Sequence, residues 1–293
     1  MKGRADSDTV SISVIVPTIY RWPTARATLD SLLPQLRAAG GELVLVVTDS
    51  DGLPPTIPPA VRTVVTGATD VFEQRAAGIA AAAGDLVAVG EDHVVFEEGW
   101  VTHAIAAFDS PEVAGSVGSI RNGAAGPLDR ACFWVTLGPW FPPLPVELST
   151  DRTPVPGNVV LRREVAAEVA GRAGALEYEL LPRLLADGVL RGTDGQRAVH
   201  DQSMSPRRAL VMHFASGRSY GAAASRGGRA ARLQEAAKAP LVIFRQTAAV
   251  WASRGSSETR TCRLLVATIA AANGLGQVVG ILRGTGSARR QLD

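Results

Sequence analysis

Short apolar runs alternate with amphipathic segments along the first 90 residues. Residues 10–16 (VSISVIV) and 42–48 (ELVLVVT) are rich in β-branched side chains, and such continuous runs predict strands that are covered on both faces. Between these runs, the leucines at positions 29, 32, 33 and 36 follow helical spacing, and two glycines at 40–41 are a stop signal. This alternation predicts a parallel sheet built from βαβ units.

The rest of the chain continues the pattern in a more irregular form. We predict further strands at 61–65, 85–89, 114–120 and 158–161, further helices at 71–83, 100–108, 163–171 and 176–186, a strand or loop at 189–200, and two apolar helices at about 229–252 and 261–282. Residues 139–156 are rich in Pro and predict a loop, whereas residues 218–229 are rich in Gly, Ala, Ser and Arg and predict a hinge. We therefore expect an α/β domain over residues 1–225 and a helical tail over residues 226–293.

Composition narrows the class of protein. Hydrophobic residues make up 46% of the 293 residues and charged residues 20%, which is enough for a sizeable core. Thirty Lys and Arg against 28 Asp and Glu leave a net charge of +2, so the balance gives no case for a nucleic-acid partner. Cys132 and Cys262 are too few and too far apart for a zinc knuckle or a disulfide framework. The polar first nine residues do not resemble a secretory signal, and we expect a cytoplasmic protein.

Polar residues follow three of the predicted strands. Thr18 comes after the first strand, Asp49 and Asp51 after the second, and the tripeptide Glu91-Asp92-His93 after the fourth. Each is an ordinary turn former by itself, but ligands of parallel sheets bind beyond the carboxyl ends of the strands, where these groups would converge. The chain has no G-x-G-x-x-G or G-x-x-x-x-G-K-[ST] motif, which disfavours a dinucleotide-binding domain and a P-loop enzyme.

Several separate segments together resemble family 2 glycosyltransferases. They are SVIVPT at 13–18, Asp49, QRAAG at 74–78, AGDLVAVGEDHVVFEEGW at 83–100, PGNVVLRRE at 156–164 and LEYELLPRLLADG at 176–188, and they follow the order of the family over roughly residues 10–225. The resemblance implies the GT-A fold, a Rossmann-like, mostly parallel sheet flanked by helices, here with a C-terminal helical extension. It also implies an inverting transfer of a sugar from a nucleoside diphosphate, such as a UDP-sugar, to an acceptor.

The resemblance further implies a divalent metal, Mn or Mg. The family's Asp-x-Asp motif holds the donor's diphosphate through such an ion, and it reads Glu91-Asp92-His93 here. Glu91 offers an oxygen and His93 a nitrogen, a combination that suits manganese better than magnesium, and relatives place a later residue such as His200 on the ion. Because the motif departs from its usual form, the alternative that Glu91 and Asp92 only bind ribose and backbone groups stays open.

The remaining site residues are also assigned by the resemblance. An inverting transfer needs a general base, and counting back from Arg183-Leu184 places Glu177 on the base position, with Glu179 as the second candidate. Both acids would also stabilise the start of a helix, because negative charge there interacts favourably with the helix dipole. Thr18, Asp49 and Arg75 would contact the nucleoside, with Asp51 as the alternative carboxylate to Asp49. Gly157 and Asn158 would line the sugar or acceptor pocket, and Arg75, His200 and Arg218 would meet the charge on the leaving diphosphate.

The predicted tail and the acceptor leave alternatives open. Gly276, Gly280 and Gly284 recur at intervals of four, which allows close helix packing, and with Trp251 and several Arg residues the tail fits the inner surface of the cell membrane. A helix pair packed on the domain, or a homodimer contact, explains the same apolar faces. The acceptor class is equally open between a glycan, a lipid-linked molecule and a small molecule. A non-catalytic GT-A module that binds a nucleotide is the alternative function; a nucleotidyltransferase is disfavoured because no Gly-rich loop with Lys and Arg follows the first strand.

Overall fold

The computed structural model describes residues 10–18, 25–50, 53, 56–150, 154–225, 228–252, 260–286 and 288. Its strands are β1 (Ile12–Thr18), β2 (Glu42–Val47), β3 (Val61–Val65), β4 (Leu86–Val89), β5 (Val94–Phe96), β6 (Gly115–Asn122), β7 (Val159–Arg162) and β8 (Leu190–His200). Its α-helices are α1 (Ala25–Ala39), α2 (Val71–Ala81), α3 (Trp100–Ala106), α4 (Pro127–Thr136), α5 (Arg163–Ala167), α6 (Leu181–Ala186), α7 (Pro206–Ala224), α8 (Arg229–Ala252) and α10 (Arg263–Arg283). A π-helical turn, Leu176–Leu180, precedes α6.

The strands form one mixed sheet in the order β3-β2-β1-β4-β7-β6-β8-β5. The first four strands in this order pair in parallel, as the alternation of strands and helices in the sequence predicts. β7 is antiparallel to both of its neighbours, β6 and β8 are parallel to each other, and the short β5 is antiparallel to β8. The predicted mostly parallel, helix-flanked sheet is therefore confirmed.

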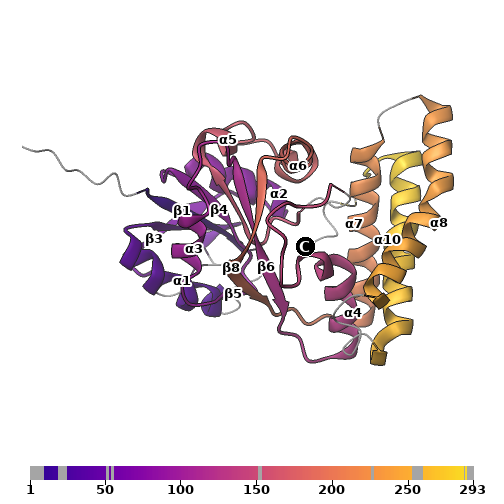
Figure 1. The fold of residues 1–293 in the computed structure, drawn as a ribbon, viewed down its shortest axis with the longest axis horizontal. Helices are drawn as coiled ribbons and strands as arrows, with labels where there is room; N and C mark the ends of the chain where they lie inside the picture. Colours follow the sequence, from indigo (N-terminus) through magenta and orange to yellow (C-terminus); the bar gives the residue numbers. More distant parts are fainter. Residues whose placement is uncertain are drawn as a thin grey trace, which may run out of the picture.

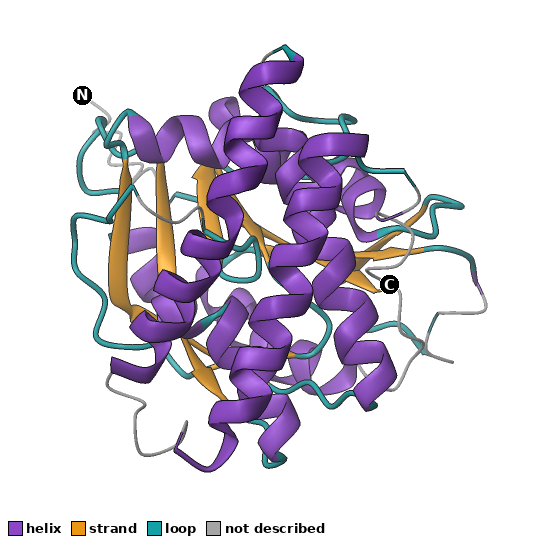
Figure 2. Cartoon of the chain, turned by 90° about the vertical axis from the view of Figure 1, so that its right-hand side faces the viewer, coloured by secondary structure: helices purple, strands orange, loops and turns teal. Residues whose placement is uncertain are grey.

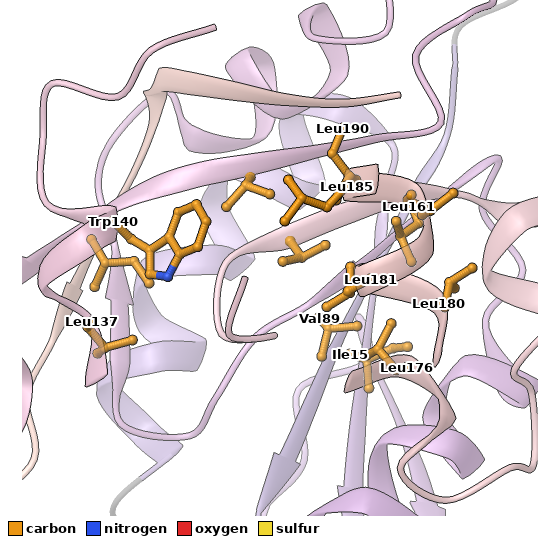
Figure 3. Packing of buried hydrophobic residues seen from close by; sticks show 14 of the residues in the cluster. Ile15, Val89, Leu137, Trp140, Leu161, Leu176, Leu180, Leu181, Leu185 and Leu190 are labelled. Atoms are coloured by element: carbon orange, nitrogen blue, oxygen red, sulfur yellow. The ribbon is translucent and has the colours of Figure 1, made fainter. Parts of the chain in front are cut away.

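Helices cover both faces of the sheet, which explains the continuous apolar runs in the strands (Figure 1). Every residue of β1 is buried: Val14 and Val16 pack with the leucines of α1 on one face, whereas Ile15 lies in the core of the other face. Figure 3 shows that second core, where Ile15 and Val89 lie near leucines of the π-helical turn and α6. The turn that carries Glu177 is thus anchored on the sheet through Leu176 and Leu180, both about 97–98% buried.

The C-terminal helices pack against one another and against the sheet domain. α7, α8 and α10 lie side by side (Figures 1 and 2), and α10 contacts α7, α8 and α4. At its start, Cys262 and Val266 belong to the core of the sheet domain, and further along Ile269 packs with Cys132 of α4 and Ala209 of α7. The predicted helical extension is present, and its helices are packed onto the domain through α4.

Small residues set the close approach of α7 and α10. The glycines that face the neighbouring helix are Gly217 and Gly221 on α7 and Gly276 and Gly280 on α10. A Cβ atom at Gly217 would lie 1.9 Å from the carbonyl oxygen of Asn273, and one at Gly276 would lie 2.0 Å from that of Phe214. The predicted hinge is wrong for residues 218–224, which form the last two turns of α7. Its Gly-rich composition reflects helix contact and not a break in the helix.

We expect Gly276→Val to destabilise the protein by about 3 kcal/mol or more, the upper end of overpacking effects, because backbone atoms of α7 cannot move aside as a side chain can. The matched control is Ala271→Val, which adds a valine at an exposed position of the same helix. Urea unfolding followed by far-UV circular dichroism measures both variants. Equal stability of the two variants would show that α7 and α10 do not interlock as described.

Among the described residues, α10 is the one helix long and apolar enough to cross a membrane by length and composition, with a mean hydropathy of 1.7 over its best window. Only 39% of that window is buried inside the protein. Leu264, Leu275 and Leu282 are exposed on it, at 84%, 61% and 43%. Contacts with α7 account for Gly276 and Gly280 without lipid, whereas Gly284 ends α10 with a positive φ, so attachment to a membrane stays a prediction. The side chain of Trp251 lies outside the described part of the chain.

Candidate active site

A cavity of about 280 Å³ lies where the carboxyl ends of β1 and β4 meet α2, α4, α7 and the π-helical turn. It contains the predicted residues Arg75, Glu91, Asp92, His93, Glu177 and His200, together with residues from α4, α7 and the segment 154–156. Ligands of sheets of this kind bind at the carboxyl ends of the strands. The cavity is therefore the candidate active site.

Asp92 holds the turn between β4 and β5 from inside the protein. The residue is buried; one carboxylate oxygen accepts a hydrogen bond of 2.8 Å from the Thr18 hydroxyl, and the other lies 2.8 Å from Nδ1 of His93. Thr28 donates a further hydrogen bond of 2.9 Å to the backbone carbonyl of Asp92. With Nδ1 directed at Asp92, the His93 ring presents Nε2 to His200 and Glu91 in the cavity. In this structure Thr18 and Asp92, both predicted to bind the nucleotide, orient the ring of His93.

Three side chains converge on one point in the cavity. Nε2 of His93 and Nε2 of His200 lie 3.0 Å apart, and one Glu91 oxygen lies 3.4 Å from the first and 3.8 Å from the second. Ligand atoms bound at about 2.1 Å to one ion lie roughly 3–3.5 Å apart, so this group, in which all ligand atoms are within 4.8 Å of one another, fits a divalent metal. Strand register brings His200 there, because β8 pairs His200 with Val94, the residue after His93.

The charges of this group depend on one another. Burial alone would lower the pKa of His93, but hydrogen bonds and charge from Asp92 and Glu91 raise it to about 9. Burial and the positive charge of His93 lower the pKa of His200 to about 4. Burial opposes ionisation of Glu91, yet His93 and Arg75 hold its pKa well below the usual range. At neutral pH the group therefore holds an imidazolium, a neutral imidazole and a carboxylate.

Arg75 connects this group to Glu177. The side chain is 7% exposed, and its guanidinium forms two ion pairs, one of 2.8 Å with Glu91 and one of 2.9 Å with Glu177. Arg75 comes from α2 and Glu177 from the π-helical turn, which are 102 residues apart in sequence. The structure thus brings the predicted base candidate and the predicted metal ligands into a single cavity, joined by one side chain.

Other predicted site residues lie elsewhere. Glu179 is 55% exposed and forms an ion pair with Arg172 outside the cavity. Asn158 is fully buried: its side chain accepts a hydrogen bond from Trp100 and donates to backbone carbonyls of neighbouring strands, so it serves the core and not a sugar pocket. Arg218 donates to the carbonyl of Gly284 at the end of α10.

The last three predicted site residues are Gly157, Asp49 and Asp51. Gly157 lies against Glu91, because a Cβ atom there would be 3.2 Å from its carboxyl group. Asp49 is exposed just beyond the end of β2 and is not part of the cavity wall. Asp51 lies outside the described residues.

Sequence reasoning missed α4 and α7, which supply much of the cavity wall. From α7 come Met212, His213, Ser216 and Tyr220, and from α4 and its end come Asp129, Phe133 and Leu137. A signal for α7 was available: Ser205 precedes Pro206, and its hydroxyl accepts a hydrogen bond from the Arg208 amide as an N-cap. The α7 residues that line the cavity are spaced so that they lie on one face of the helix.

Solved structures that are similar to this chain are glycosyltransferases. A mannosyltransferase, PcManGT from Pyrobaculum calidifontis, solved with GDP-Man and Mn²⁺, superposes with a TM-score of 0.58 at 16% identity over 89% of this chain and 86% of its own. Glucosyl-3-phosphoglycerate synthase from Mycobacterium tuberculosis, solved with Mn²⁺, UDP and phosphoglyceric acid, reaches 0.49 at 17% identity over 73% of this chain and 77% of its own. At this low identity, the similarity to the mannosyltransferase, with its TM-score above 0.5, shows the GT-A fold alone.

A search of curated proteins gives no match. The model of the family "Glycosyl transferase family 2" matches residues 13–169, which is more than half of the 293 residues. This chain therefore belongs to glycosyl transferase family 2.

Proposed function

We propose that this protein transfers a sugar, with inversion, from a nucleoside-diphosphate donor to a hydroxyl group of an acceptor, and that Glu177 is the general base. The observation that carries the proposal is the pair of ion pairs of Arg75, which hold Glu177 and Glu91 on either side of one guanidinium. A general base must reach the proton of the acceptor hydroxyl, which attacks the donor beside its diphosphate, and the Glu91 group is where that diphosphate would lie.

In the reaction, the acceptor oxygen forms a bond to the anomeric carbon while the bond from that carbon to the diphosphate oxygen breaks. The proton of the acceptor hydroxyl passes to the Glu177 carboxylate, and the bonding electrons leave with the diphosphate. A divalent cation held by Glu91, His93 and His200 would act as a Lewis acid for the charge that grows on the leaving oxygen. Asp92 keeps His93 oriented for this task, and Arg75 keeps Glu177 in place.

Two observations support a nucleoside-diphosphate donor and a divalent metal ion. The chemistry of the three side chains fits a divalent ion, and their two nitrogens favour manganese over magnesium. The mannosyltransferase of similar fold was solved with GDP-Man and Mn²⁺. The exposed Asp49 beyond β2 stays our proposed contact for the nucleoside base, and Gly157 our proposed contact for the sugar.

A donor screen tests the function directly. The metal-free protein is mixed with UDP-, GDP- and TDP-sugars, with and without Mn²⁺, and its melting temperature is recorded. We expect one nucleotide class to raise the melting temperature only with Mn²⁺, because a ligand at 100 times its Kd stabilises the native state by about 2.7 kcal/mol. NMR of the product then reports the anomeric configuration. Binding of a donor without transfer to any acceptor or water would favour the non-catalytic module instead.

The charge state of His93 predicts how metal binding depends on pH. Since a metal ion must displace the proton on His93, whose pKa is about 9, the apparent Mn²⁺ affinity should rise about tenfold per pH unit up to that pH. His200, with a pKa of about 4, is already neutral and adds no slope in this range. Isothermal titration calorimetry at pH 6.5, 7.5 and 8.5 measures the slope. A flat profile would show that His93 is not a ligand.

Attachment to a membrane is a separate proposal. Exposed apolar side chains on α8 and α10, among them Phe244 at 67% and Leu264 at 84%, support contact of the C-terminal helices with the inner surface of the cell membrane. A vesicle flotation assay with the full chain tests it. Recovery of the protein in the soluble fraction at all lipid compositions would contradict it.

A further inference from the structure

One wall of the cavity is formed by α7, next to the proposed base. Met212, His213, Ser216 and Tyr220 all line the cavity, and their spacing along the chain places them on one face of the helix. α7 also contacts the π-helical turn that carries Glu177. A molecule that lies along this face would therefore have its hydroxyl group close to Glu177.

Much of the remaining cavity wall is apolar. It includes Phe133 and Leu137 from α4 and its end, and Pro154 and Val155. Among the described residues of the cavity wall, Arg75 is the sole Arg or Lys, and both of its ion pairs are with carboxylates of the site. Asp129 adds a further carboxylate, which accepts a hydrogen bond from the Met204 amide. Away from the group of Glu91, His93 and His200, a phosphate or carboxylate of an acceptor would meet Asp129 and apolar side chains, and its desolvation would be unfavourable.

His213 provides a second, independent pointer to a ligand. Its side chain is 3% exposed, and its Nε2 has no hydrogen-bond partner among the described residues. Burial lowers the pKa of His213 to about 4, so the ring is neutral at physiological pH and can donate or accept a hydrogen bond. An unsatisfied buried polar group costs on the order of 1–3 kcal/mol. Nε2 itself has almost no accessible surface, so a hydroxyl group of a bound molecule would recover this cost once the ring, which lines the cavity, turns Nε2 toward it.

We propose that the acceptor is an uncharged alcohol or phenol with an aromatic or alicyclic body, bound along the α7 face, and that His213 hydrogen-bonds to a second polar group of that body. The proposal rests on the proposed function, since it names the acceptor class of the same site. It makes α7 a part of the active site and not only a helix that carries the C-terminal extension.

Equilibrium binding tests the acceptor class apart from transfer. The full chain with Mn²⁺ is titrated with 2-naphthol and with 6-hydroxy-2-naphthoic acid, which share the ring and the hydroxyl but differ in charge. We expect 2-naphthol to bind at least tenfold more tightly. Equal or tighter binding of the acid, or of farnesyl phosphate as an anionic lipid, would overturn the proposal, as would no binding of 2-naphthol. Because the donor screen is a separate measurement, failure of the proposed function is recognised there.

Variants on α7 locate the site. Ser216→Trp and the smaller Ser216→Leu fill the cavity and should lower 2-naphthol affinity at least tenfold, with Mn²⁺ affinity within about twofold of wild type. Leu210→Trp, at a position of α7 that is 41% exposed, is the matched control. His213→Phe should remove the preference for 2,6-dihydroxynaphthalene over 2-naphthol but leave 2-naphthol binding in place. Unchanged 2-naphthol affinity in both Ser216 variants would place the acceptor elsewhere.

Discussion

Glu177→Gln should lower the turnover number of sugar transfer by about 10²–10⁴-fold, the range over which general bases contribute, and leave metal-dependent donor binding nearly unchanged. Glutamine has the same length, and its amide oxygen can still accept the 2.9 Å hydrogen bond from Arg75. It cannot take the proton of the acceptor hydroxyl. Steady-state kinetics with the donor found in the screen give the turnover number, and thermal shift gives donor binding.

The sequence itself offers the control for this experiment. Glu179 lies two residues away in the same π-helical turn, but its side chain is 55% exposed and pairs with Arg172. Glu179→Gln should therefore keep turnover within about twofold of wild type, since an exposed ion pair contributes little. If Glu179→Gln is the inactive variant and Glu177→Gln the active one, the base has been assigned to the wrong acid. Comparable loss in both variants would point to damage of the turn.

The parts of the fold that were predictable are those in which local pattern and tertiary environment agree. β1, β2 and β4 are buried on both faces, so their sequences are mostly apolar and easily recognised as strands. α7 is the opposite case. Gly217 and Gly221 are required by the carbonyl groups of α10, which come from a segment more than 50 residues further along the chain. Read locally, these glycines suggest a break in the helix.

The same distinction applies to the site. Motif order led to the prediction of Glu91, His93, His200 and Glu177 as site residues, and the structure places these four side chains in one cavity. The partner of each carboxylate was not predictable, because it depends on residues distant in sequence. Asp92 faces Thr18, 74 residues earlier, and so positions His93 from within the protein. Asn158 resembles a pocket residue by its motif, but the indole of Trp100 and the carbonyls of two strands use its side chain fully.

Loss of one histidine should separate metal binding from folding. We expect His200→Ala to weaken Mn²⁺ binding by more than about 100-fold, because even residues that only orient a metal ligand contribute 10–100-fold to affinity. Donor binding and transfer should fall with it. The matched control is His103→Ala, an exposed histidine of α3. Calorimetric Mn²⁺ titrations measure the affinities, and a His200→Ala affinity within tenfold of wild type would remove His200 from the proposed site.

A second substitution at position 200 tests whether this side chain binds the metal ion. His200→Glu replaces a nitrogen with an oxygen of similar reach beside Glu91 and His93, so an ion can still be held by three side chains. Oxygen ligands suit magnesium, whereas imidazole nitrogen favours the transition metals. We therefore expect His200→Glu to bind Mn²⁺ more tightly than His200→Ala does, and to raise the affinity for Mg²⁺ relative to Mn²⁺ over that of the wild type. A relative affinity that stays unchanged would mean that the side chain at position 200 does not touch the ion, and that the nearness of His93 and His200 reflects only the packing of β5 on β8.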